Sequence, residues 1–130
     1  MSIYIKEDDK SSLSFLFLGD WGWTGVNQSS VADQMSLWSS ENDASFVIAL
    51  GDNFYKDGVT SVKDDKWKST FKKPYYHESL INIPWYAILG NHDYHSNPKA
   101  QIDYYYLNRN SQKVSFYYHY YYYYYQILLS

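Results

Sequence analysis

The sequence has 130 residues, no cysteine and a formal net charge of −3, and 45% of its residues are hydrophobic. This length predicts a single domain with enough apolar residues for a core, and the lack of cysteine excludes disulfides and thiolate metal ligands. The charge gives no reason to expect binding to nucleic acid or to an anionic membrane surface.

The first twelve residues form a polar segment with several charged side chains. This segment has no apolar stretch followed by a small-residue cleavage site, so it is not a signal peptide. The first apolar run, Leu13–Leu18, is far shorter than the roughly 20 residues that cross a bilayer. We therefore expect a polar extension over residues 1–12 and no membrane partner.

Short apolar runs at three places along the chain predict the strands of a sheet. They are Leu13–Leu18, Phe46–Leu50 and Trp85–Leu89, the last preceded by Pro84, which is tolerated at the start of a strand. Their nearly continuous apolar character is typical of parallel strands that are covered on both faces. Helical patterns lie between them, so the sequence predicts an α/β fold with a mainly parallel sheet.

The first predicted helix runs from Ser30, as its N-cap, to about Ser40. Its apolar face is formed by side chains at helical spacing, namely Val31, Ala32, Met35 and Trp38. This stripe indicates core packing between the first two strands.

Two more helices are predicted further along the chain. One runs from Asp64 to about Lys73, and its mixed charges indicate a solvated face. The other has Asn97 at its N-cap and Pro98 in its first turn, and it reaches about Leu107.

Each predicted strand is followed by a glycine and then by a side chain that carries oxygen. Asp20 follows the first strand, Asp52 the second and Asn91 the third, while Tyr55 and His92 come shortly after. The carboxyl ends of parallel strands meet at one edge of a sheet. We therefore expect these five side chains to cluster at that edge.

The chemistry of these side chains favours a metal site for phosphoryl transfer. Carboxylate, amide, phenol and imidazole groups bind hard or borderline cations, and the two oxygens of Asp52 could bridge two ions. A metal pair supplies hydroxide at mild pH, and His92 could protonate the leaving group or steady the phosphate. Taken singly, Asp20 and Asn91 could be turn residues and Tyr55 an ordinary packed aromatic, so the hypothesis depends on the three loops together.

Other aromatic and histidine side chains lie close to these loops in the sequence. Trp21 and Trp23 could wall a pocket or pack over the edge of the sheet. We expect His95 to have a surface or supporting role and His77 to be an exposed loop residue.

The end of the chain, residues 109–130, is of low complexity. Every residue from Tyr117 to Tyr125 is tyrosine except His119. Tyrosine favours strands, and an exposed β-prone tract favours self-association. We assign no chemistry to this Tyr-rich tail, and the domain itself is expected to span residues 13–108.

Three sequence blocks carry a resemblance to a known family. They are Gly19-Asp20-Trp21-Gly22, Gly51-Asp52-Asn53-Phe54-Tyr55 and Gly90-Asn91-His92-Asp93. These blocks resemble the purple acid phosphatases, most closely the small tartrate-resistant type, within the metallophosphoesterase (calcineurin-like) superfamily. The resemblance covers about residues 14–107. The tyrosine three residues after the second aspartate disfavours other branches, such as the protein Ser/Thr phosphatases, nucleases and cyclic-nucleotide esterases.

The resemblance implies a fold and an activity. The fold would be a four-layer α/β/β/α sandwich on two stacked sheets, of which this chain supplies the N-terminal half. The activity would be that of an acid phosphatase that hydrolyses phosphate monoesters, either small molecules or phosphoproteins, through a metal-activated hydroxide.

The resemblance also implies a role for each residue of the three loops. Asp20 would ligate Fe(III), Asp52 would bridge both metals, and Tyr55 would bind as the phenolate that gives the purple colour. Asn91 would ligate the second, divalent metal, which is iron, zinc or manganese. His92 would be the catalytic histidine beside the metals.

The sequence departs from the family in its histidines. Family members carry three further histidine ligands later in the chain, including a His-x-His pair, whereas here only His119 follows His95. The alternative is therefore a truncated, catalytically inactive fragment of such an enzyme. Family members are usually secreted or lysosomal, but the sequence shows no signal peptide, so it does not determine the localisation.

Overall fold

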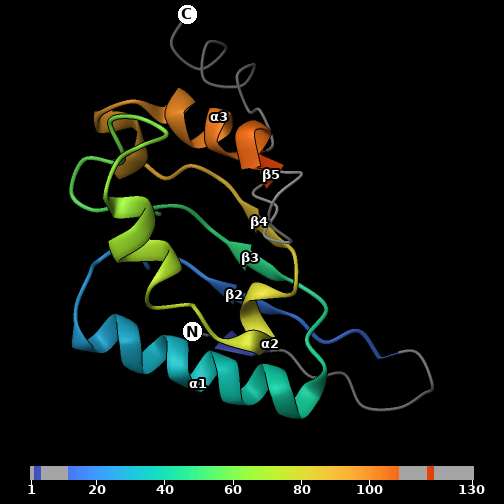
Figure 1. Cartoon of the computed structure of the whole chain (residues 1–130). Helices are drawn as coiled ribbons and strands as arrows, with labels where there is room; N and C mark the ends of the chain where they lie inside the picture. The colour runs from blue at the N-terminus through green and yellow to red at the C-terminus, as the bar shows by residue number, and fades with distance from the viewer. Residues whose placement is uncertain (1, 4–11, 109–116, 119–130) are drawn as a thin grey trace, which may run out of the picture.

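The computed structural model describes residues 2–3, 12–108 and 117–118. Within them the chain forms a five-stranded sheet whose order follows the sequence (Figure 1). The first strand is antiparallel to its neighbour and the others run parallel, which confirms a mainly parallel α/β sheet. The strands are β1 (Ser2–Ile3), β2 (Leu16–Leu18), β3 (Val47–Ala49), β4 (Trp85–Ala87) and β5 (Tyr117–Tyr118).

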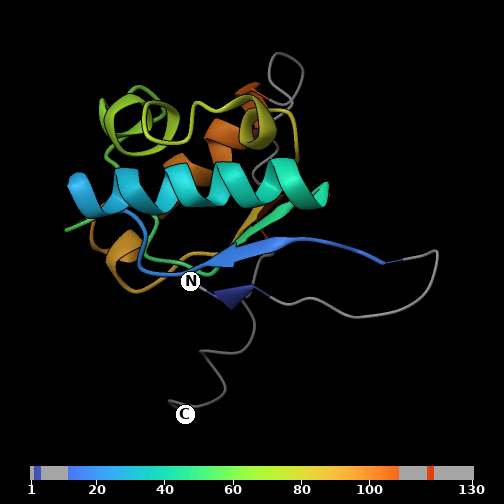
Figure 2. The same ribbon diagram turned by 90° about the horizontal axis from the view of Figure 1, so that it is seen from below.

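The sheet has one buried face and one open face among the described residues. Figure 2 shows α1, η1 and α2 on the same side of the sheet, and the side chains that point to them are buried. On the other face Phe17 and Ile48 are half-buried and Tyr86 is exposed. The described residues therefore form one sheet with helices on one of its faces.

Helix α1 (Val26–Asn42) is longer than predicted and begins earlier. Gly25 is its N-cap, so Ser30 lies inside the helix and the prediction of Ser30 as the N-cap is wrong. The early turn is fixed by Gln28, whose buried amide donates to the Trp21 and Thr70 carbonyls at 2.8 and 2.9 Å. The buried face is formed by Gln28, Ala32, Met35 and Ser39, while Val31, predicted to face the core, is 37% exposed.

The remaining helices are short except the last. The predicted helix from Asp64 is a π-helical segment, η1 (Trp67–Lys72), and it is followed by a helix that was not predicted, α2 (Glu78–Ile81). A 3-10 turn, η2 (His92–His95), precedes α3 (Pro98–Asn108). The Asn97 side chain accepts a hydrogen bond from the Ala100 N–H at 3.2 Å, which confirms the predicted cap. No helix within the described residues is long and apolar enough to cross a membrane.

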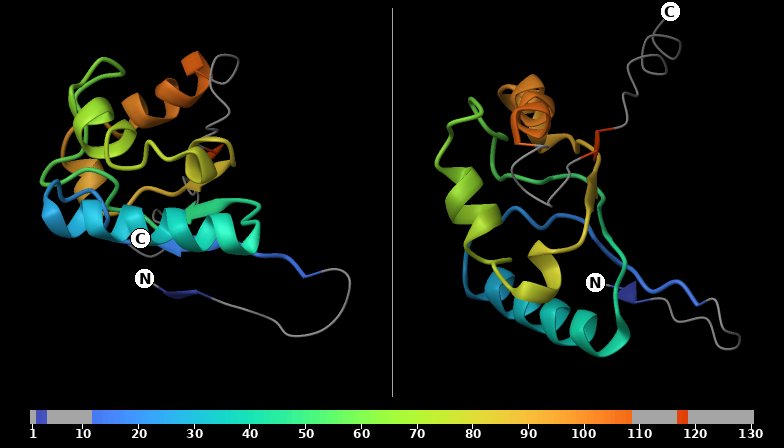
Figure 3. Two further views of the ribbon diagram at one scale, coloured as in Figure 1. Left: turned by 60° about the horizontal axis from the view of Figure 1, so that its bottom comes forward. Right: turned by 45° about the vertical axis from the view of Figure 1, so that its right-hand side comes forward.

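The aromatic core lies between the sheet and the helices. Trp21 is 5% exposed, and its ring lies 5.5–6.0 Å from those of Phe54, Phe71, Tyr75 and Trp85. Edge-to-face and tilted ring pairs of this kind stabilise a core beyond the area that they bury. They fix the first strand-end loop against η1 and β4, and Figure 3 shows η1 next to α3, to which it is joined by the stacked rings of Trp67 and Tyr104.

The two edge strands come from segments that we expected to lie outside the domain. Ser2 and Ile3, which belong to the predicted polar extension, pair with Phe17 and Leu16 of β2. Tyr117 and Tyr118 pair with β4, in keeping with the strand preference of tyrosine. The rest of the Tyr-rich tail lies outside the described residues.

Candidate metal centre

Backbone hydrogen bonds join the first two strand-end loops beyond the ends of β2 and β3. The Asp20 N–H donates to the Gly51 carbonyl at 3.2 Å, and the Gly22 N–H donates to the Asp52 carbonyl at 3.1 Å. The Tyr55 N–H then donates back to the Gly22 carbonyl at 3.2 Å. Both carboxylates and the phenol are therefore carried by backbone that the sheet itself aligns.

The second and third loops approach each other too closely for any residue but glycine. Gly51 has a φ of +96°, and a Cβ there would lie 2.7 Å from the Gly90 nitrogen. A Cβ on Gly90 would overlap both the carboxylate and the backbone nitrogen of Asp52. The glycines before Asp52 and Asn91 are thus required by close backbone approach and, at Gly51, by left-handed backbone.

Three oxygens converge at the edge of the sheet, and we call them the oxygen triad: Asp20 Oδ1, Asp52 Oδ2 and Tyr55 Oη. The Tyr55 hydroxyl lies 2.6 Å from Asp20 Oδ1 and 3.0 Å from Asp52 Oδ2. Burial, together with hydrogen bonds to the two carboxylates and their charge, raises the pKa of Tyr55. A phenol has one proton and cannot donate it to both oxygens at once. An oxygen set this rich in negative charge fits a hard cation.

The two aspartates of the triad are held in left-handed backbone. Asp20 has a φ of 54° and Asp52 a φ of 51°, a region that residues with a Cβ seldom adopt. Asp43 has a similar φ of 49°, but it is the C-cap of α1, where left-handed backbone is usual. The two triad aspartates have no such capping role, and strain of this kind is concentrated at functional sites.

His92 lies beside the triad and is fixed from two sides. Its backbone N–H donates to Asp52 Oδ1 at 3.0 Å, and its ring centre lies 4.5 Å from that of Tyr55. Its Nδ1 lies 2.6 Å from the Lys56 carbonyl, which can only accept, so Nδ1 carries the proton and Nε2 is left free. The His95 ring lies 5.1 Å from that of His92, as a supporting residue would.

Asn91 is placed between Gly90 and His92 at the exposed start of η2. Within the described part of the chain its side chain makes no hydrogen bond, so its amide oxygen is free to bind an ion. Over the same residues no group of three His, Cys, Asp or Glu side chains is close enough to hold a metal. The oxygen triad therefore depends on its tyrosine to supply a third donor beside the two carboxylates.

Residues 13–129 match the calcineurin-like phosphoesterase family. The chain belongs to this family. It is 48% identical over 99 residues to purple acid phosphatase 7 of Arabidopsis thaliana, covering 75% of this chain and 30% of that protein. It is 34% identical to human tartrate-resistant acid phosphatase type 5, covering 72% of this chain and 30% of that protein. The resemblance to purple and tartrate-resistant acid phosphatases is confirmed, and the chain spans about 30% of the length of these relatives.

A solved structure supports the same fold. It is described as GAP50, the anchor in the inner membrane complex of Plasmodium, and it superposes with a TM-score of 0.62 at 27% identity. The superposition covers 78% of this chain and 31% of that one. The metallophosphoesterase-like α/β fold predicted from the sequence is therefore confirmed.

Asp93, which the sequence patterns leave without a role, organises the candidate metal centre. Asp93 is fully buried, and its carboxylate accepts hydrogen bonds from the backbone N–H groups of Asn53, Phe54 and Gly90 and from the Gln101 amide at 2.9–3.2 Å. Burial raises the pKa of Asp93 even though these donors favour its charged form. Asp93 ties the second loop, the third loop and α3 together. The sequence does place a charged residue directly after Asn91 and His92. The sequence alone cannot tell whether such a residue binds the metal or holds the loops in place.

Proposed function

We propose that the chain contributes the first metal ligands of a binuclear-metal acid phosphatase that hydrolyses phosphate monoesters. The observation that carries this proposal is the oxygen triad, in which two carboxylates and a phenol converge within 3.0 Å. The relatives named acid phosphatases give the reaction class. Bound metals would supply charge neutralisation and a hydroxide nucleophile at mild pH.

The residues of the chain would divide the remaining work. Asp20, Asp52 and Tyr55 would hold Fe(III), and Asp52 together with Asn91 would hold a divalent iron, zinc or manganese ion. Because Asp52 is buried, fewer water molecules would compete with the triad oxygens for the metal than at a fully exposed site. Asp52 has the strongest claim to a bridging position, because it is 8% exposed and the loops around it touch both of its oxygens.

His92 would act on the proton of the leaving group. Its Nδ1–H is held by the Lys56 carbonyl, which leaves Nε2 as the position that gains or gives a proton. Its backbone N–H holds Asp52, so one residue positions both the carboxylate and the acid–base group. A positioned histidine contributes typically 10²–10⁴-fold to such a reaction.

Titration of the full chain with Fe(III) tests the proposal, with tyrosinate absorption as the readout. We expect one weakly held ion and a visible band that Tyr55→Phe abolishes, because a phenolate ligand produces it. Asp52→Asn should also remove binding, whereas Asp103→Asn, which changes an exposed carboxylate of α3, should not. A band that survives Tyr55→Phe would place the metal elsewhere.

A second candidate function follows from the number of ligands. Within the described residues no three acidic or histidine side chains form a metal site, so these residues alone support a metal-binding chain without hydrolysis. Hydrolysis of an aryl phosphate by the metal-loaded full chain separates the two functions. We expect a rate far below that of a purple acid phosphatase of full length, and a comparable rate that depends on Asp52 would exclude the inactive alternative.

A further inference from the structure

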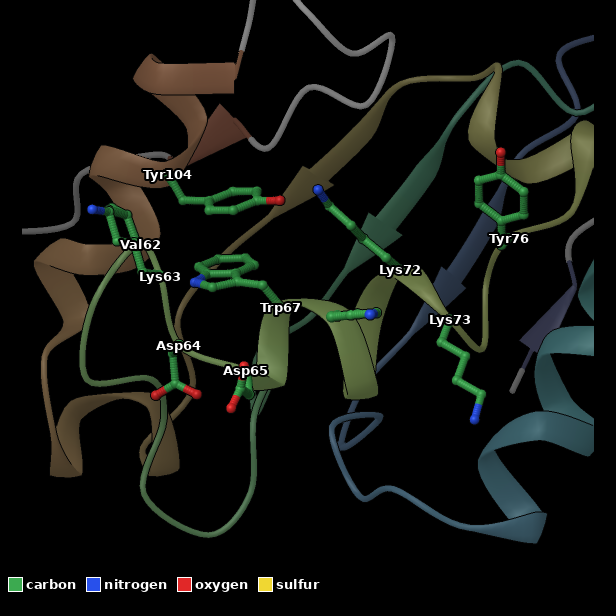
Figure 4. Close-up of a pocket in the computed structure, with 10 residues that line it drawn as sticks. Val62, Lys63, Asp64, Asp65, Trp67, Lys72, Lys73, Tyr76 and Tyr104 are labelled. Carbon is green, nitrogen blue, oxygen red and sulfur yellow. The ribbon is translucent and has the colours of Figure 1, made fainter.

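A cleft of about 610 Å³ lies between η1 and α3 and contains none of the candidate metal ligands (Figure 4). Four lysines and a stacked aromatic pair form most of its wall. We call it the lysine groove, after the side chains that define it: Lys63, Lys68, Lys72, Lys73, Trp67 and Tyr104.

The floor of the lysine groove is a rigid aromatic pair. Trp67 and Tyr104 stack with their ring centres 3.6 Å apart and their planes 6° from parallel, and both are more than nine-tenths buried. Trp67 also lies 4.7 Å from the Phe54 ring, centre to centre. The faces of both rings are therefore largely used inside the protein, and the groove meets mainly their edges.

A polar group in this floor has no partner. The Tyr104 hydroxyl is buried and makes no hydrogen bond to any described residue. Figure 4 shows it pointing toward the ammonium of Lys72, which lies 5.7 Å from the centre of the Tyr104 ring. Buried hydroxyl groups usually have a partner. A ligand that moves Lys72 aside or joins it would supply the acceptor that this hydroxyl lacks.

The lysines of the groove are not neutralised by the protein. Within the described residues none of the four forms an ion pair. Asp64 and Asp65 also line the groove, so its four lysines outnumber its carboxylates, and the Asp64 carboxylate is already held by the N–H and hydroxyl of Thr60 at 2.8 and 2.9 Å. The whole chain has a net charge of −3, but its lysines make the groove locally positive, so the groove attracts anions.

These features select among anionic ligands. Lysine binds phosphate as a point charge, and compact phosphate sites commonly add arginine forks or convergent backbone N–H groups to it; the described residues include no arginine. Nucleic-acid bases stack on open aromatic faces, whereas the faces of Trp67 and Tyr104 are occupied. A peptide with carboxylates spaced along its length can pair with lysines that lie apart from one another. Its apolar side chains can pack against the edges of the aromatic rings that lie between those lysines.

We propose that the lysine groove binds an acidic peptide segment of a partner protein. This interaction surface is separate from the metal centre and does not depend on the proposed phosphatase activity. The mixed charges of residues 63–73, which in sequence indicate a solvated face, here form one wall of a binding groove.

The test is fluorescence anisotropy of a dye-labelled ten-residue peptide of alternating Glu and Leu, titrated with the full chain without metal. We expect binding at low salt that weakens at high salt, and no binding of the matched peptide of Gln and Leu. The double variant Lys68→Gln/Lys72→Gln should weaken binding roughly fivefold, by the usual strength of exposed ion pairs. The control Lys56→Gln/Lys99→Gln removes the same charge outside the groove and should leave binding unchanged.

Two further probes decide whether the ligand is a peptide, and one variant separates this proposal from the catalytic one. If triphosphate or an oligothymidylate displaces the Glu–Leu peptide at equal or lower concentration, the groove is a site for small anions or nucleic acid and the proposal is wrong. Equal binding of the Gln–Leu peptide, or equal loss in both double variants, also overturns it. Asp52→Asn should bind the peptide as the unmodified chain does, whatever the outcome of the metal titration.

Discussion

Asp93 offers the sharpest test of how the candidate metal centre is held together. Its Oδ1 accepts from Asn53, Phe54 and Gln101, and its Oδ2 accepts from Asn53 and Gly90. Asp93→Asn can keep the first oxygen, but it puts an NH₂ group against the Gly90 N–H in place of the second. A hydrogen bond to a charged group contributes about 1.5–3 kcal/mol, and an unsatisfied buried donor costs about 1–3 kcal/mol.

We expect Asp93→Asn to lower the free energy of unfolding by about 2–4 kcal/mol, after allowing for the cost of burying the charge that it removes. Asp93→Ala should cost more because it leaves every one of these donors without a partner. Urea unfolding followed by circular dichroism measures the effect, with an unchanged m-value as the sign of a clean comparison. Asp103→Asn is the control, since Asp103 is in an exposed pair with Lys99 and should change stability by less than about 1 kcal/mol. An Asp93→Asn variant within about 0.5 kcal/mol of the unmodified chain would refute the supporting role.

Two other substitutions test local claims by the same unfolding assay. Gly90→Ala should destabilise the chain by about 1–3 kcal/mol because its Cβ overlaps Asp52. A Cβ on Gly25 meets no atom within 4 Å, so Gly25→Ala should cost less, through the preference of an N-cap for glycine over alanine alone. Equal effects of the two would remove the case for close backbone approach. Partial burial alone would raise the pKa of Asp64, but hydrogen bonds led by the Thr60 N–H outweigh it and lower that pKa. Asp64→Asn should therefore cost roughly 1–2 kcal/mol above about pH 4. The difference from the unmodified chain should narrow as the pH falls through the lowered pKa, and a difference that grows in acid would contradict this sign.

Strands β2, β3 and β4 could be predicted because each belongs to a short apolar run that is followed by glycine. Their lengths could not, because strand ends depend on pairing with neighbours: β2 keeps only Leu16–Leu18 of the run Leu13–Leu18. The start of α1 was missed for a similar reason. Its first turn is held by Gln28 through contacts with Trp21 and Thr70, and Thr70 is far away in the sequence. His77, expected to be an exposed loop residue, is half-buried and lies 3.2 Å from Asp33 of α1, because α2 packs against that helix.

The approximate place of the site was readable because three polar ends of parallel strands must meet at one edge. The structure brings Asp20, Asp52, Tyr55 and His92 into contact and places Asn91 beside them. The sequence around Trp21 and Trp23 could not show which of the two side chains is buried. Trp21 is buried and Trp23 is 58% exposed with its ring centre 5.6 Å from that of Tyr55. Both line a cleft of about 330 Å³ next to Asp20, so the two alternatives hold together: one ring packs and both wall a pocket.

The groove and the oxygen triad share one stretch of backbone, and this connection limits what each can do. Tyr55 begins the loop that ends at Trp67, and Trp67 contacts Phe54, the residue before Tyr55 in the sequence. Phe54 is fully buried and its N–H is held by Asp93. A peptide that pushes against Trp67 therefore meets the same packed core that fixes the phenol, and close-packed interiors yield little. We infer that the groove docks a partner without reshaping the metal centre, because Trp67 would have to displace the buried Phe54 ring before its movement could reach Tyr55.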